Sequence, residues 1–307
     1  MVALRRGWRT LLPVALCLLL AGCGAAGSAS SGGASGKLQV VAAENFWGSI
    51  AAQLGGDKVK VTSIITNPAT DPHDYEPTAA DARTLAGARL AIVNGIGYDA
   101  WAQKLLAANP VSGREVLNVG DLVGIEAGGN PHRWYSPPNV RQVIDAITQA
   151  YARLEPKQAA YFEAQRRSFE MRGLARYKGL IASIRQRYAG VPVGASESIF
   201  APLAQSLGLR LLTPSGFLDA ISEGTDPTAR DKTTVDDQIA GRQIKVWVYN
   251  SQNTTPDVKR LNEQAQARGI PIATVTETLT PATASFQAWQ VRQLQAIAAA
   301  LAKATGR

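Results

Sequence analysis

The two histidines of this 307-residue chain are its residues best suited to bind a metal ion. His73 and His132 each follow a proline in a short polar loop, within residues 71–77 and 130–134. Imidazole is the commonest metal ligand in proteins, although a lone histidine is more often an ordinary surface or core residue. Two matched Pro-His loops favour a shared role. Because the chain has no other histidine, a metal site that uses imidazole must draw on these two.

The amino-terminal segment has the features of a bacterial lipoprotein signal. Three arginines precede an apolar run, and residues 20–23 (LAGC) have the form of a lipobox. The apolar run breaks after roughly a dozen residues, short of the about 20 that a membrane span needs. We therefore predict a signal peptide at residues 1–22, a lipidated Cys23 that anchors the mature chain to the outer face of a membrane, and a flexible linker at 23–36.

Charge and cysteine content exclude several functions. The formal charge of +8 falls to +5 when the three signal-peptide arginines are removed, and the remaining charges alternate in sign. Without a basic run or an aromatic ladder, we expect no nucleic-acid binding. The second cysteine, Cys17, lies in the predicted signal peptide, so the folded part has neither a disulfide nor a thiolate metal ligand.

Short apolar runs alternate with helical patterns from residue 37 onward. Strands are predicted at 38–43, 59–65, 89–94, 115–119, 192–195, 210–213, 245–249 and 270–275. The helices predicted between and after them are 46–54, 79–86, 99–108, 199–207, 234–240, 258–267 and 286–302. This alternation predicts an α/β fold with mostly parallel sheets. We place two β/α lobes at residues 37–155 and 189–307.

A charged segment with a long helical pattern, and without strand patterns, separates the two lobes. Ser136 opens a helix that Pro156 ends, and residues 157–188 carry an apolar stripe at helical spacing. A helix of that length measures ~48 Å. Residues 156–188 are therefore predicted as a long rigid helix that braces both lobes.

With these pieces in place, the chain resembles the metal-binding substrate-binding lipoproteins of bacterial ABC transporters, the zinc and manganese uptake family of ZnuA type. The resemblance rests on residues 55–57 (GGD), the two Pro-His loops, Asn94-Gly95, Ser196-Glu197 and residues 276–279 (TETL). It implies two lobes joined by a rigid helix, with one divalent ion in the cleft between them. It also implies a monomer that delivers the ion to a permease and its ATPase, and that is not an enzyme.

The resemblance places four metal ligands at His73, His132, Glu197 and Glu277. The family usually has aspartate at the fourth position, so Glu277 departs from the pattern by one methylene. Glu44, at the end of the first predicted strand, is the alternative fourth ligand. Two ligands from each lobe would let lobe separation weaken the site as a whole. Residues expected to support the ligands from behind are Glu44, Asn45, Trp134 and Ser251.

The donor set suits a divalent ion. Two neutral imidazoles and two carboxylates balance a dication to zero charge, which permits burial. Carboxylates bind through one oxygen or two, so the same set serves zinc, manganese or iron(II). Zinc members of the family often carry a histidine-rich loop between the two Pro-His loops, and this chain has none. We therefore favour manganese or iron(II) over zinc.

Two other functions remain open alternatives to metal uptake. A surface adhesin or structural lipoprotein with a metal site would also sit outside the membrane. A metallohydrolase would need an open coordination position and a general base. The sequence has neither HExxH nor a nucleophile elbow to support hydrolysis.

Overall fold

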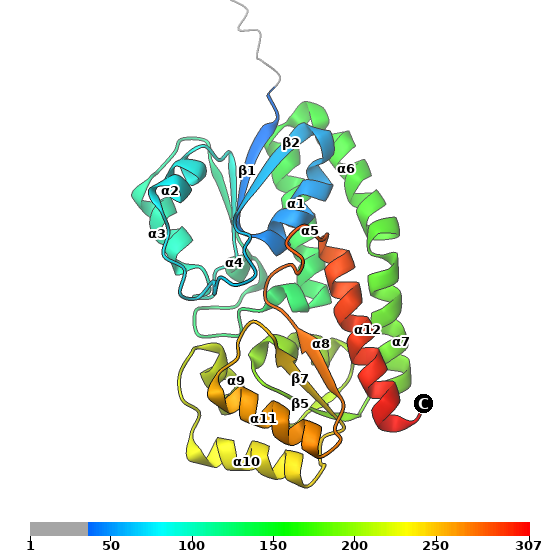
Figure 1. Cartoon of the computed structure of the whole chain (residues 1–307). Coiled ribbons are helices and arrows are strands. Elements are labelled where there is room, and N and C mark those ends of the chain that lie inside the picture. The colour runs from blue at the N-terminus through cyan, green and yellow to red at the C-terminus, as the bar shows by residue number, and fades with distance from the viewer. Residues whose placement is uncertain (1–35) are drawn as a thin grey trace, which may run out of the picture. The chain divides into compact units, whose positions relative to one another are not determined.

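The first sheet forms from four short apolar segments that pair in parallel. The computed structural model describes residues 36–307. Its strands β1 (Leu38–Glu44), β2 (Val59–Ile65), β3 (Leu90–Val93) and β4 (Glu115–Asn118) lie in the order β2-β1-β3-β4 (Figure 1). Helices α1 (Asn45–Gly55), α2 (Ala79–Ala86), α3 (Ala100–Ala108) and α4 (Val119–Val123) surround them.

The second sheet repeats the same parallel order. Strands β5 (Pro192–Ala195), β6 (Arg210–Leu211), β7 (Val246–Asn250) and β8 (Ile272–Val275) lie in the order β6-β5-β7-β8. Helices α8 (Ala201–Ser206), α9 (Ser215–Ser222), α10 (Ala229–Ala240) and α11 (Pro256–Ala267) belong to this lobe. In each sheet the second strand pairs on one side of the first strand, and the third strand pairs on its other side. This reversal creates a crevice outside the carboxyl ends of the two central strands.

Most predicted elements are present, with differences at the ends of several. Residues 210–213 pair only as far as Leu211, and α10 begins five residues earlier than predicted, at Ala229, because the Thr228 hydroxyl accepts the Asp231 N–H and caps it. Helices α4 and α9 were not predicted, since both are short. Further short 3₁₀ turns occur at Gly56–Lys58, Arg133–Tyr135, Pro156–Gln158 and Ser198–Phe200.

The linking segment consists of several helical pieces. Ser136 caps α5 (Pro137–Leu154), which is followed by α6 (Ala159–Ser168), a π-helical turn (Phe169–Gly173) and α7 (Ala175–Tyr188). The predicted long helix is therefore present, and a π-helical turn at Phe169–Gly173 interrupts its α-helical geometry. The Leu174 N–H donates to the Phe169 carbonyl at 2.8 Å, a five-residue bond that apolar spacing does not reveal.

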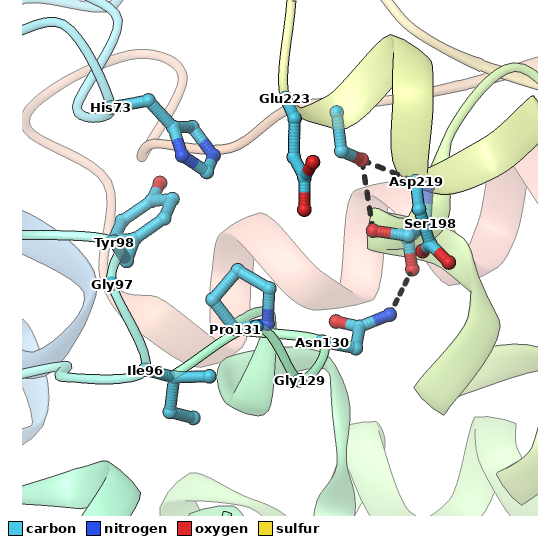
Figure 2. A pocket seen from close by; sticks show the side chains of 12 residues that line it. His73, Ile96, Gly97, Tyr98, Gly129, Asn130, Pro131, Ser198, Asp219 and Glu223 are labelled. Atoms are coloured by element: carbon cyan, nitrogen blue, oxygen red, sulfur yellow. Dashed lines mark hydrogen bonds between the residues drawn. The ribbon is translucent and has the colours of Figure 1, made fainter. Parts of the chain in front are cut away.

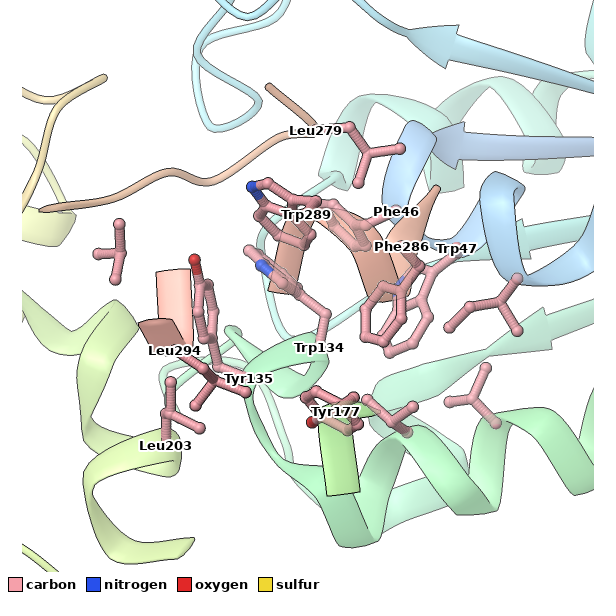
Figure 3. Close-up of a cluster of buried hydrophobic side chains, with 14 of the residues drawn as sticks. Phe46, Trp47, Trp134, Tyr135, Tyr177, Leu203, Leu279, Phe286, Trp289 and Leu294 are labelled. Carbon is pink, nitrogen blue, oxygen red and sulfur yellow. The ribbon is translucent and has the colours of Figure 1, made fainter. Parts of the chain in front are cut away.

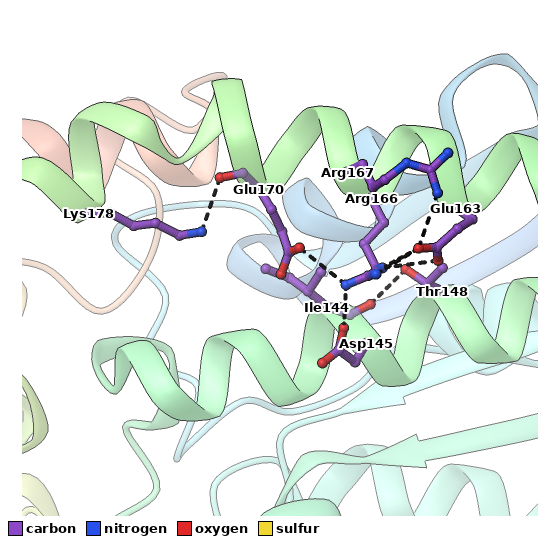
Figure 4. A network of polar contacts seen from close by, with 8 residues as sticks. All are labelled: Ile144, Asp145, Thr148, Glu163, Arg166, Arg167, Glu170 and Lys178. Atoms are coloured by element: carbon purple, nitrogen blue, oxygen red, sulfur yellow. Dashed lines mark hydrogen bonds and ion pairs between the residues drawn. The ribbon is translucent and has the colours of Figure 1, made fainter.

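An arginine joins the linking segment to α5. Arg166 on α6 contacts Asp145 on α5 at 3.0 Å, and also Glu163 and Glu170 at 2.7 and 3.2 Å (Figure 4). These side chains are partly exposed, so each pair alone contributes little, and a network holds its geometry better than an isolated pair. The network fixes the first half of the linking segment against the first lobe.

One apolar core continues from the first lobe into the second. The last helix, α12 (Phe286–Thr305), packs on α7 and on β8, and its first residues also meet α1. Figure 3 shows the aromatic part of this core, in which Phe46 stacks on Trp134 with ring centroids 3.9 Å apart. Across the lobes, the Phe286 N–H donates to the Ser49 hydroxyl at 2.9 Å. Residues 37–307 thus form one compact unit.

The predicted signal peptide, Cys23 and nearly all of the linker lie outside the described residues. Within residues 36–307, none of the helices combines the length and the apolar character needed to cross a lipid bilayer.

Candidate metal centre

His73 lies in the loop between β2 and α2. The Asp71 carboxylate accepts the His73 N–H at 2.9 Å, which fixes the turn, and Thr78 and Asp81 cap the helix that follows. The imidazole packs edge-on against the Tyr98 ring, with centroids 4.6 Å apart, and its Nε2 atom is buried without a partner. The capped helix and the aromatic ring therefore leave one ring nitrogen free to bind a ligand.

His132 is fully buried in the loop before α5. Its Nδ1 atom lies 3.1 Å from the Asn130 side-chain oxygen, an acceptor, so Nδ1 carries the proton and Nε2 keeps its lone pair. The Asn130 amide nitrogen donates to the Ser198 carbonyl of the second lobe at 2.7 Å. Burial lowers the pKa of the His132 imidazole well below its usual range. The ring is therefore neutral and ready to bind a metal at pH 7.

Glu277 approaches the histidines from the second lobe, in the loop after β8. The Tyr98 hydroxyl donates to Glu277 Oε2 at 2.8 Å, and the Asn250 amide donates to Oε1 at 3.0 Å. The Asn45 side-chain oxygen accepts the Leu279 N–H at 3.1 Å and so holds this loop against the first lobe. Burial raises the pKa of the Glu277 carboxyl well above its usual range.

His73, His132 and Glu277 form a triad whose ligand atoms all lie within 4.8 Å of one another. Two ligands bound tetrahedrally to one zinc-like ion would be about 3.4 Å apart. Atoms at the 4.8 Å limit would therefore have to approach each other by about 1.4 Å to bind a single ion. The triad draws two ligands from the first lobe and one from the second.

Glu197 lies beside the triad without being part of it. It follows β5, and the Asn250 amide nitrogen that reaches Glu277 also donates to Glu197 Oε1, at 2.6 Å. The Asn253 amide donates to Oε2 at 2.7 Å. Burial raises the pKa of the Glu197 carboxyl to about 7. One nitrogen thus bridges the two carboxyls of the second lobe.

Glu44 does not join the triad. Its carboxyl is fully buried, has no hydrogen-bond donor, and interacts with the carboxyl of Asp99. The Asp99 carboxylate accepts the N–H groups of Asn94 and Gly95 at 2.6 and 2.8 Å, and these hydrogen bonds stabilise its negative charge. Burial raises the pKa of Glu44 well above its usual range. Burial beside the Asp99 carboxyl therefore favours the protonated, neutral form of Glu44.

The loop that contains Asp99 needs glycine at position 95. Gly95 has φ +72°, in the left-handed region, and a Cβ there would lie 2.1 Å from the Asn118 side-chain oxygen. The loop places Asn94 where its amide donates to the Pro131 carbonyl, 2.9 Å away and directly before His132. The Asn94-Gly95 pair thus helps to position the second Pro-His loop.

The remaining predicted supporting residues have different surroundings. Trp134 is buried, with its ring edge-on to His132 at a centroid distance of 5.2 Å, and so covers that ligand from water. Ser251 is exposed, and its hydroxyl reaches only the Val275 carbonyl, at 3.5 Å. The carboxyl contacts in this turn come from its neighbours Asn250 and Asn253.

A cavity of about 170 Å³ leads from the surface to His73. His73 and Tyr98 line one side of it, and residues of the second lobe, Ser198, Asp219 and Glu223, line the opposite side (Figure 2). The negative charge of Glu223 acts on the His73 imidazole. The cavity therefore offers a cation a path to the triad.

Sequence analysis missed three side chains that contact the site. Tyr98 and Asn253 bond the carboxyls directly, and Asn130 bonds His132. All three follow strands or flank ligands in the chain, but tyrosine and asparagine are common in loops, so their type carries no signal. Only the folded arrangement identifies their partners.

Comparison with known proteins agrees with this architecture. The chain matches a family model described as zinc-uptake complex component A, periplasmic, over residues 40–300. It is 28% identical over 276 residues to the metal ABC transporter substrate-binding lipoprotein FimA of Streptococcus parasanguinis. The aligned region covers 83% of this chain and 84% of FimA. It is 27% identical over 234 residues to the iron-binding protein YfeA of Yersinia pestis, covering 68% and 74% of the two chains.

A solved structure shows the same fold. The manganese-bound periplasmic metal binding protein from Candidatus Liberibacter asiaticus superposes with a TM-score of 0.70 at 20% identity. The match covers 86% of this chain and 100% of that chain. The two-lobed α/β architecture predicted from the sequence is therefore confirmed.

Proposed function

This chain belongs to the family described as zinc-uptake complex component A, and from that premise we propose that it captures one divalent metal ion outside the cytoplasm and delivers it to an ABC permease. The observation that carries this proposal is the triad of His73, His132 and Glu277, gathered from both lobes. Glu197 becomes the fourth ligand through a small movement toward the ion. The protein then acts by binding and release.

The electrostatics of the site favour a dication. None of the ion pairs within residues 36–307 involves Glu197 or Glu277, so no lysine or arginine neutralises them. With both histidines neutral, one dication balances both carboxylates, and the buried site becomes neutral. A monovalent ion would leave one buried charge unbalanced.

The cargo we propose is manganese or iron(II). Two carboxylates supply up to four oxygens beside the imidazole nitrogens, which suits the higher coordination numbers of these ions. Among the relatives named above, YfeA is described as iron-binding and the Candidatus Liberibacter asiaticus protein as manganese-bound. Zinc should nevertheless bind more tightly than manganese in vitro, because affinities follow the Irving–Williams order. Affinity alone therefore does not identify the cargo.

Elemental analysis tests the proposed function. The lipoprotein purified without chelators is expected to hold one dication per chain, and cells that lack it should contain less of that metal than the parent strain. A double variant of His73 and His132 to alanine serves as the control and should hold none. A wild-type protein without bound metal, or with the same content as the double variant, contradicts the proposal.

Release of the ion must accommodate the shared core of the lobes. A large apolar interface opposes wide opening, and the core continues through Phe46, Trp134 and Trp289. The ligands lie on loops at the strand ends, which move at lower cost. We therefore propose that release occurs mainly through the loops that carry His73 and Glu277, with only a small displacement of the lobes.

A lipid anchor at Cys23 would hold this protein at the membrane beside its permease. Cys23→Ala removes the acyl acceptor, so the protein should remain unprocessed or appear in the soluble fraction. Metabolic labelling with a fatty-acid analogue measures this, with Cys17→Ala as the matched control that should keep its label. Label retained by Cys23→Ala would rule out the anchor. The partners we propose are a permease and its ATPase, and the protein is proposed to be a monomer.

A further inference from the structure

The two lobes carry the same pair of residue types at equivalent positions. In the first sheet, Ala42 pairs with Ile92, and Glu44 and Asn94 lie two residues further along. In the second sheet, Ala195 pairs with Val248, and Glu197 and Asn250 lie two residues further along. Each lobe therefore has a glutamate and an asparagine side by side at its crevice.

The asparagine amides of the two lobes face different partners. In the second lobe, the Asn250 nitrogen donates to Glu197 at 2.6 Å and to Glu277 at 3.0 Å. In the first lobe, the Asn94 nitrogen donates to the Pro131 carbonyl, and Glu44 receives no donor. Glu197, which has the amide donor, lies beside the triad, whereas Glu44, which has none, interacts with Asp99.

The orientation of the Asn250 amide is fixed by its own contacts. Its side-chain oxygen accepts the Gln252 N–H at 3.0 Å, and its backbone N–H donates to the Ser196 hydroxyl at 3.1 Å. The nitrogen must therefore point at the two carboxyls. The side chain is fully buried, so water does not compete for these bonds.

The turn that contains Asn250 also joins the two lobes. Gln252 accepts the Glu277 N–H at 2.6 Å and donates to the Pro68 carbonyl, in the loop that leads to His73. Asn253 donates to the second oxygen of Glu197 and to the Ile221 carbonyl. Neutral amides thus hold two carboxyls close together and leave their charge available for a cation.

We propose that Asn250 is a positioning residue that sets the spacing of Glu197 and Glu277 and thereby selects ions that use oxygen from both. This inference rests on the proposed function, because it takes Glu197 and Glu277 as ligands. Manganese depends on both carboxylates for its higher coordination number, whereas zinc needs only four ligands and prefers nitrogen more strongly. Asn250 therefore favours manganese or iron(II) relative to zinc.

The variant Asn250→Asp removes the amide donor. Aspartate keeps the shape and the oxygen that accepts the Gln252 N–H, but it replaces the nitrogen that bridges the carboxyls with an acceptor oxygen, whose negative charge repels Glu197 and Glu277 and moves them apart. In the detergent-solubilised lipoprotein, manganese affinity is expected to fall about tenfold, the lower end of the range for lost outer hydrogen bonds to ligands. Zinc affinity should fall several-fold less.

Two further variants and a spectrum distinguish positioning from a general effect on folding. Asn253→Asp loses a donor to Glu197 alone, so its manganese affinity should fall less than that of Asn250→Asp. Ser251→Ala, in the same turn but exposed, should stay within twofold of wild type. At saturating cobalt(II), the d–d absorption of Asn250→Asp should differ from wild type, because the coordination has changed.

The possible results separate the two proposals. An unchanged or tighter manganese affinity in Asn250→Asp, or an unchanged cobalt spectrum, overturns the positioning role. If wild type binds one manganese ion and Asn250→Asp binds it equally well, only this inference is overturned. Wild type that binds no dication overturns the proposed function, and this inference fails with it.

Discussion

Glu277→Gln is expected to weaken manganese binding about a hundredfold, or about 2.7 kcal/mol. The substitution keeps the size of the side chain and an oxygen that can accept from Tyr98, but it removes the charge that balances the ion. Glu277 is the carboxyl that lies within 4.8 Å of both histidine ligand atoms. Titration calorimetry at pH 7.5, with competing chelator where binding is tight, measures the change.

Glu44→Gln is the matched control for this measurement. A protonated Glu44 and a glutamine both present a neutral donor to Asp99, so metal affinity should stay within twofold of wild type. The reverse ranking of the two variants would show that Glu44, the alternative from sequence analysis, is the fourth ligand. A metal-bound structure with the Glu277 carboxylate more than about 3 Å from the ion would exclude Glu277 as a ligand, because direct bonds measure about 2.0–2.2 Å.

Metal binding is expected to stabilise the fold by about 4 kcal/mol at a free concentration a thousandfold above Kd. For a chain of this size, the melting temperature should rise by about 7 °C. Differential scanning calorimetry with and without a chelator measures this, and the variant without both histidines should show no rise. An unchanged melting temperature for a protein verified to contain metal would contradict a site that ties the lobes together.

This stabilisation should grow as the pH rises through about 7. Burial raises the pKa of Glu197 to about 7 and that of Glu277 well above its usual 4.5, whereas it lowers the pKa of both histidines. The carboxyls therefore hold the protons that a metal must displace. A site limited by ordinary imidazoles would instead lose affinity as the pH falls through about 6.5.

The sign of the effect on the metal-free protein follows from the same raised pKa values. A carboxyl with a raised folded pKa contributes stability that is fully present below its unfolded pKa of 4.5 and is lost as the pH rises through the folded value, about 7 for Glu197. Glu197 and Glu277 should thus contribute less stability to the metal-free protein as the pH rises from 4.5 to 7, and the metal removes that loss. The two histidines, whose pKa values are lowered, act in the opposite direction up to about pH 6.5. A gain in melting temperature that shrinks over this range would contradict these assignments.

The sequence by itself determined the elements and the two histidines. Strand and helix periods are local, so the strands at residues 59–65 and 192–195 and the helix at 79–86 were predicted with their observed bounds. His73 and His132 were singled out because the chain has no other imidazole. The parallel direction of the strands in each sheet was predicted from the alternation of strands and helices.

Only the tertiary structure decided between the two candidate carboxyls. Glu44 and Glu277 both follow strands, and no local pattern shows which neighbours meet them. Folding brings Asp99 to Glu44, and it brings Tyr98, Asn250 and the histidines to the side of Glu277. These contacts join residues far apart in the chain.

The equivalence of the lobes was also invisible in the sequence, where no convincing repeat occurs. It emerges from strand register, which places Glu197 and Asn250, and likewise Glu44 and Asn94, two residues beyond a paired position in each sheet. Register and hydrogen-bond partners depend on how separate segments pack, and packing is a property of the whole chain. The sequence therefore predicted which residue types would bind a metal, and the fold determined which carboxyl lies beside the two histidines.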